Sequence, residues 1–133
     1  STFDAPDRET CTVRRPRTNT PLQALVLLND PTYIEAARKF AERLLRERQT
    51  DADRIAHAFR LATARPPRSA EAAALAEVLE AQRRHYAADR AAALKLLANG
   101  ESPRDEAFDP AELAAWTMVA SAILNLDETV TKG

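Results

Sequence analysis

Three predicted helix starts in this chain have a residue that can cap a helix directly before a proline: Thr20-Pro21, Asp30-Pro31 and Asp109-Pro110. Proline suits the first helical position, because the amide hydrogen that it lacks would have no partner there and its φ is already helical. Gln23 and Glu112 follow two of these caps by three residues, which is the spacing of a capping box. The sequence therefore predicts helices over about residues 21–29, 31–48 and 109–126.

Two further helices fill the middle of the chain. Thr50 or Asp51 caps a helix that must end before Pro66-Pro67, since the residue before a proline avoids the helical region. Ser69 is interpreted as the cap of a fourth helix, which either continues to Leu97 or breaks near Ala88 and restarts. Glycine occurs only twice, and no stretch alternates apolar and polar residues for long. These features predict an all-α fold, a compact bundle of about five helices with antiparallel neighbours.

The spacing of apolar residues predicts which faces are buried. The 21–29 segment is apolar on all sides, and a helix of that kind is expected to lie inside the protein. In the 31–48 helix the charged side chains share the other face, which we expect to be solvated; they are Glu35, Arg38, Lys39, Glu42, Arg46 and Glu47. Five aromatic residues lie on apolar faces and are expected to pack in the core rather than to form a sugar-stacking platform; they are Tyr33, Phe40, Phe59, Tyr86 and Trp116.

Residues 1–18 follow neither a helical nor a strand period and contain two prolines. We expect an extended arm there, docked on sequence upstream of this chain, and a single helical domain over residues 19–133. The chain opens with Ser1 and has no initiator methionine, so it is interpreted as part of a longer protein, and for that reason the lack of a signal peptide says little.

Charge and composition argue against several function classes. The net charge is −1, whereas a dedicated nucleic-acid binder usually carries a clear basic excess. No apolar run is long enough to predict a membrane span. Cys11 is the only cysteine, which excludes an intrachain disulfide and the Cys-x-x-Cys-His haem motif; an inert thiol is favoured over a nucleophile. Two glycines cannot build a phosphate-binding loop, and no cofactor is expected.

The densest polar chemistry lies just before and after the 21–29 helix. The candidate binding or docking residues are Arg14, Arg15, Arg17, Asn19, Asn29 and Asp30. They could bind an anion or a glycan beside a helix N-terminus. The alternative, which we favour, is that they satisfy helix ends and pair with nearby acids or with an upstream domain.

Two carboxylate–imidazole pairs stand at i and i+4 spacing, Asp53 with His57 and His85 with Asp89. Such spacing could give two metal ligands, but no third ligand is evident in the sequence. We interpret both as surface pairs and predict no metal site.

The run from Arg17 to Pro31, RTNTPLQALVLLNDP, resembles the signature of the planctomycete-type PSD domain of unknown function. The similarity continues through Glu35–Arg38, Arg54–Ala62, Arg65-Pro66 and Trp116–Glu128, and it corresponds to the C-terminal part of that domain. The resemblance implies a large exported protein, often with a planctomycete-type cytochrome c domain ahead of this region, and hence a periplasmic or otherwise exported location. It supplies no catalytic residues.

These observations favour a structural and interaction module that docks on upstream domains of its parent protein, or on a protein or glycan partner. The competing hypothesis is enzymatic: Arg17, Asn19, Asn29 and Asp30 would then belong to a glycan-binding surface or active site for polysaccharide chemistry, completed by upstream domains. We expect no catalysis by this chain alone. A carbohydrate-binding module is disfavoured by the aromatic content of 5%.

Overall fold

The computed structural model describes residues 31–126, which form five α-helices and no strand. They are α1 Pro31–Glu47, α2 Asp51–Thr63, α3 Ser69–Ala88, α4 Arg90–Leu97 and α5 Pro110–Leu124. The predicted all-α fold is confirmed. The predicted arm over residues 1–18 and the predicted 21–29 helix lie outside the described residues. The fourth predicted helix is broken, as one of its two alternatives had it, and forms α3 and α4.

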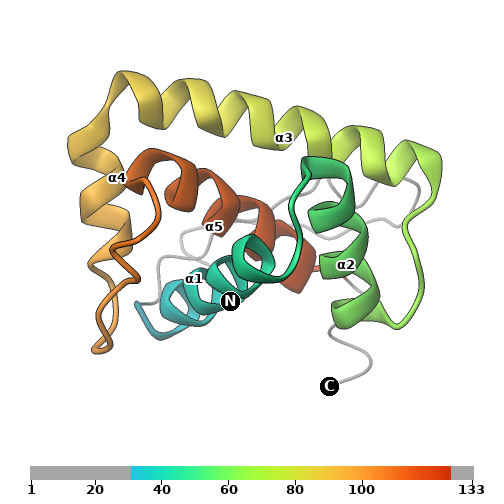
Figure 1. Cartoon of the computed structure of the whole chain (residues 1–133), viewed down its shortest axis with the longest axis horizontal. Helices are drawn as coiled ribbons and strands as arrows, with labels where there is room; N and C mark the ends of the chain where they lie inside the picture. Colours follow the sequence, from blue (N-terminus) through green and yellow to red (C-terminus); the bar gives the residue numbers. More distant parts are fainter. Residues whose placement is uncertain (1–30, 127–133) are drawn as a thin grey trace, which may run out of the picture.

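Helix α5 lies at the centre of the bundle, with α3 on one side of it and α1 on the other (Figure 1). Helices α2 and α4 lie at opposite ends of this three-helix layer, and α3 and α5 run in opposite directions (Figure 1). All four of the other helices contact α5. None of the helices within residues 31–126 combines the length and the apolar character needed to cross a bilayer.

Every residue of α5 from Leu113 to Ile123 is buried. The buried surface therefore extends around the whole helix and is not confined to one stripe of residues. Small side chains make this possible, because alanine, serine and threonine between the large residues let neighbouring helices approach from several directions. The core is therefore organised around the last helix of the described chain.

Three of the helix starts are explained by local side chains. The Thr50 hydroxyl accepts the amide of Asp53 at 3.2 Å, and Asp109 accepts the amide of Glu112 at 3.1 Å, as predicted. Between α3 and α4, Asp89 accepts the amide of Ala92 at 3.0 Å, so this residue restarts the helix.

The prediction that Ser69 caps α3 is wrong. Arg68 occupies the N-cap position and Ser69 is the first helical residue. The reason is that Glu71 reaches back and accepts the Arg68 amide at 2.8 Å, so the orphan donor is satisfied from inside the first turn. A small polar cap is not needed at that helix start.

Candidate functional site

The six candidate residues of the polar segment, Arg14, Arg15, Arg17, Asn19, Asn29 and Asp30, lie outside the described residues, as does Cys11. The structure does show the fold that this segment joins, because Asp30 directly precedes α1. It also shows where the charged side chains of residues 31–126 gather. Two clusters stand out, one between α1 and the connection to α5, the other between three helices.

The first cluster is centred on Arg38, whose side chain is only 1% exposed. Its guanidinium donates to the Glu42 carboxylate at 2.8 Å. It also donates to the Ser102 carbonyl at 2.8 Å, to the Ser102 hydroxyl at 3.1 Å and to the Pro103 carbonyl at 3.2 Å. Ser102 and Pro103 belong to residues 98–109, the segment between α4 and α5, which we call the strap. Arg38 thus joins α1 to a part of the chain more than sixty residues away.

Two carboxylates of α1 complete this attachment. Glu35 accepts the Ser102 amide at 2.8 Å and also accepts the Ser102 hydroxyl, and these bonds lower the pKa of Glu35 to about 2. Glu42 accepts the Asp105 amide at 2.8 Å. We call Glu35, Arg38 and Glu42 the α1 latch. Their spacing places all three on one face of the helix, so one strip of side chains bonds successive polar groups of the strap.

The prediction that the charged face of α1 is solvated is therefore wrong for Arg38 and Glu42, which are both buried. It holds for Lys39, Arg46 and Glu47, which are exposed. The difference arises because the strap covers the middle of that face and supplies backbone carbonyls and amides as partners. Buried charged groups are tolerated when they are paired and hydrogen-bonded in this way.

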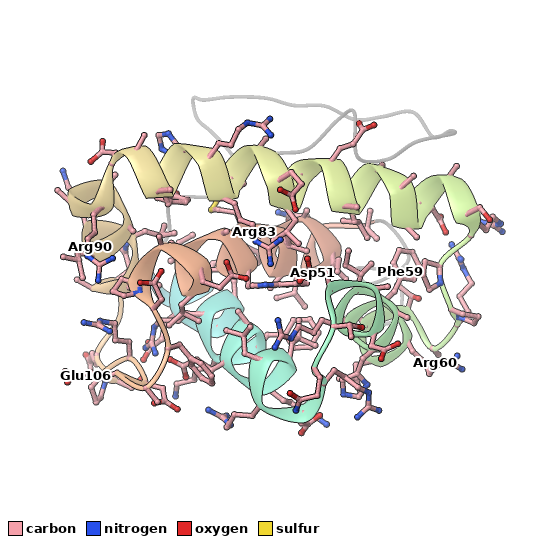
Figure 2. All side chains as sticks on the ribbon, turned by 45° about the horizontal axis from the view of Figure 1, so that its top comes forward. Asp51, Phe59, Arg60, Arg83, Arg90 and Glu106 are labelled. Atoms are coloured by element: carbon pink, nitrogen blue, oxygen red, sulfur yellow. The ribbon has the colours of Figure 1, made fainter. Side chains whose placement is uncertain are left out.

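The second cluster is centred on Arg83 of α3, which points toward Asp51 at the start of α2 (Figure 2). Its two terminal nitrogens donate to the two Asp51 carboxylate oxygens at 2.8 and 2.9 Å. The Nε and one terminal nitrogen of Arg83 donate to the Glu112 carboxylate of α5. A terminal nitrogen of Arg83 also donates to the Glu80 carboxylate of α3 at 2.8 Å. We call Arg83, Asp51, Glu80 and Glu112 the Arg83 hub. It ties three helices together.

The electrostatics of the hub follow from these contacts. Hydrogen bonds to Asp51 and Glu112 raise the pKa of Arg83, so it stays charged. The same bond from Arg83 holds the pKa of the Asp51 carboxyl below its ordinary value. Glu112 also accepts the indole N–H of the buried Trp116 at 3.0 Å, which links the surface network to the core.

A third pair fixes the connection between α2 and α3. Arg65 donates to both oxygens of Glu71 at 2.9 and 3.0 Å, and its guanidinium lies 4.9 Å from the centre of the Phe59 ring. The bonds from Arg65 lower the pKa of Glu71. This arginine therefore bridges the end of one helix and the start of the next.

The two predicted carboxylate–imidazole pairs are not the ones that the structure forms. His57 contacts Glu47 of α1 at 2.7 Å in place of Asp53. His85 packs edge-on against Tyr86, and Asp89 caps α4. Residues 31–126 hold no group of three or more His, Cys, Asp and Glu side chains arranged to bind a metal ion.

The aromatic residues divide by position in the fold. Phe59, Tyr86 and Trp116 are buried, so the prediction of core packing is confirmed for them. Tyr33 is half-buried, and its hydroxyl donates to the Ser121 carbonyl of α5 at 3.1 Å. Burial raises the pKa of Tyr33 to about 12. Tyr33 therefore joins the first turn of α1 to the end of the central helix.

The sequence did not predict the contacts of either the α1 latch or the Arg83 hub. Arg38 and Glu42 carry a visible signal, the i, i+4 spacing of an ion pair, but nothing in that spacing shows that a later segment covers them. Arg83 carries only the i, i+3 spacing to Glu80, which does not single it out, because the neighbouring Arg84 stands four residues from Glu80 and is exposed.

A family model described as "PSD1: Protein of unknown function (DUF1553)" matches residues 1–79, which is more than half of the chain. No curated protein matches. No solved structure matches either.

Proposed function

The chain belongs to the PSD1 family of proteins of unknown function (DUF1553), and we propose that it is a non-catalytic structural and interaction module of a larger exported protein. One observation carries this proposal: the charged clusters of the described residues bond separate elements to one another. The α1 latch joins α1 to the strap, and the Arg83 hub joins α2, α3 and α5. Ion pairs that join separate elements in this way hold the helices in fixed positions relative to one another.

The placement of α1 extends the argument to the docking residues. Two bonds from different directions hold the first turns of α1, one from Tyr33 to the Ser121 carbonyl and one from the Ser102 amide to Glu35. The candidate docking residues, Arg14, Arg15, Arg17, Asn19, Asn29 and Asp30, immediately precede this anchored helix in the sequence. A polar segment attached to a fixed helix is suited to docking, because less freedom is lost on binding when the support is already ordered.

The proposed partner is the part of the parent protein that precedes Ser1, in a planctomycete-type, periplasmic or otherwise exported setting. A separate protein or a glycan is the second choice of partner. Arginine side chains are suited to such a contact, since the planar guanidinium makes bidentate bonds to carboxylates and is more weakly hydrated than an ammonium group.

Titration calorimetry of the 133-residue chain against the preceding region of the parent protein tests the proposal. Wild type should bind, and Arg15→Ala combined with Arg17→Ala should weaken binding by about 1–3 kcal/mol, the range for partly desolvated charged contacts. Arg60→Ala combined with Arg84→Ala is the matched control. Both arginines are exposed on helices, and neither side chain forms an ion pair within the described residues, so this variant should bind like wild type.

Absence of binding, together with turnover of a polysaccharide or ester panel by the chain alone, would favour the enzymatic alternative. Equal weakening by the two double variants would show that the effect is one of net charge and would reject the docking segment.

A further inference from the structure

We propose that the strap, residues 98–109, is a hinged segment that opens from α1 while the helices stay folded, and that opening uncovers the charged strip Glu35, Arg38 and Glu42. The inference concerns described residues and does not depend on the identity of the docking partner. The α1 latch would then exist in two states, one covered by the strap and one exposed to solvent.

The first argument is the nature of the attachment. The strap is held to α1 by hydrogen bonds from the three latch side chains, which reach Ser102, Pro103 and Asp105, and by one exposed bond from Arg46 to the Asp105 carboxylate. The elements on either side of it are fixed by Leu97 of α4 and Leu113 of α5, which are fully buried in the hydrophobic core, whereas Phe108 of the strap is only partly buried against that core. Segments with few buried apolar contacts open locally at a smaller free energy than the core elements that flank them.

The second argument is that the closed state leaves Arg38 incompletely satisfied. Its Nε is buried and has no hydrogen-bond partner in the part of the chain that the structure describes. A buried donor without a partner costs about 1–3 kcal/mol, and an orphan of this kind needs an explanation. When the strap opens, water reaches the whole guanidinium. The hydration of Arg38 therefore offsets part of the loss of the strap's own bonds.

The third argument concerns Gly100, which allows the strap to approach α1 closely. Its φ is +91°, a left-handed value that favours glycine. A Cβ built at this position would lie 2.5 Å from side-chain atoms of Glu35. Any larger residue must push the strap and Glu35 apart, so one substitution that changes no charge is expected to shift the strap toward its open state.

Amide hydrogen exchange followed by NMR measures the opening of the strap directly, as the exchange rates of its amides. The Ser102 and Asp105 amides are the reporters, because each donates to a latch carboxylate, and the Val119 and Ala120 amides of α5 report unfolding of the core. In wild type the two reporters should exchange faster than the α5 amides. Low concentrations of urea should leave their rates unchanged, as expected for local opening, while the α5 rates rise.

Two variants test the latch. Gly100→Ala and Arg38→Lys should each speed exchange at Ser102 and Asp105 by about tenfold or more relative to the α5 amides, the factor that corresponds to one lost hydrogen bond. Arg43→Lys is the matched control: it lies on α1 and pairs with Glu47 at the same i, i+4 spacing, but it is exposed and contacts no strap residue. It should leave the reporter rates at their wild-type values.

The proposal is overturned if Ser102 and Asp105 exchange with the free energy and urea dependence of the α5 amides, because the strap would then open only on global unfolding. It is also overturned if Gly100→Ala leaves the two reporter rates unchanged. Using two variants guards against misfolding of either one, since the α5 amides report separately whether the core remains intact.

Discussion

Replacing Arg83 by alanine should lower the free energy of unfolding by about 2 kcal/mol. The Arg83 side chain bonds carboxylates on three helices, Asp51 on α2, Glu80 on α3 itself and Glu112 on α5. The substitution removes all of these bonds and leaves Asp51 and Glu112 without the cation that they share. Both carboxylates stay partly solvated, so neither becomes a buried unpaired charge.

The size of this loss in unfolding free energy is estimated from the exposed fractions of the four hub side chains. The Arg83 side chain is 26% exposed, Glu112 33%, Asp51 43% and Glu80 56%. Exposed ion pairs contribute about 0.2–1 kcal/mol each, and Glu80 belongs at the low end because it is the most exposed and lies on the same helix. Asp51 and Glu112 are each bound through two bonds between different helices, which places them at about 1 kcal/mol each. Their sum gives the figure of about 2 kcal/mol.

Urea denaturation of wild type, Arg83→Ala and Arg84→Ala measures the effect. Arg84 is the exposed neighbour without an ion pair in the described residues, so its loss should change stability by less than about 0.5 kcal/mol. In about 1 M salt the cost of Arg83→Ala should fall, since the Debye length there is about 3 Å. Equal effects of the two substitutions would refute the claim that the hub stabilises the fold.

The pH dependence supplies an independent check with a definite sign. Arg83 holds the pKa of Asp51 below its ordinary value in the folded protein, so the contribution of this pair is present above the unfolded-state pKa. It is lost as pH falls through the lower folded-state pKa. Wild type should therefore lose more stability than Arg83→Ala on acidification below about pH 4.

Three further outcomes are expected, each measured by chemical or thermal denaturation. Asp109→Ala should cost about 1 kcal/mol, because Asp109 accepts the Glu112 amide at the start of α5; an unchanged melting midpoint would contradict this. Ala120→Leu should destabilise by about 1–3 kcal/mol, because Ala120 is fully buried in α5 and a larger side chain must displace its packed neighbours; a neutral result would mean that the core is loosely packed. Ala64→Gly should stabilise by about 0.5–1 kcal/mol, since the φ of Ala64 is 69°; a loss of stability would count against the left-handed end of α2.

The sequence predicts helix starts well because caps act over three residues. Thr50 and Asp109 accept the amides that their spacing predicted, and the predicted break near Ala88 is present, with α3 ending at Ala88 and α4 beginning at Arg90. Ser69 fails as a cap because the helix begins one residue earlier than predicted, with Arg68 at the N-cap position and its amide accepted by Glu71 of the first turn. The N-cap of a helix can be predicted from the sequence when only one residue near the helix start can take that position.

The burial of charged residues is harder to predict from the sequence, because it depends on contacts with segments far away in the chain. Periodicity assigned Arg38 to a solvated face, and only the position of the strap shows that this side chain is buried. Likewise, no local pattern distinguishes Arg83 from Arg84; their roles separate only when α2 and α5 are placed beside α3. The predicted docking segment from Arg14 to Asp30 remains a prediction, outside the described residues.

The central position of α5 has a consequence for biosynthesis. Helices α1 and α3 lie on opposite sides of α5 and scarcely touch each other, so their apolar faces meet mainly through it (Figure 1). A ribosome releases residues 31–97 before it releases Pro110–Leu124, and domains fold as units once their chain has emerged. During that interval α1 and α3, which carry the buried residues Leu44, Leu75 and Leu79, lack the helix that they both contact in the finished protein. The nascent chain is therefore expected to be a chaperone substrate until its last described helix emerges, and a stop codon in the strap would leave that state permanent.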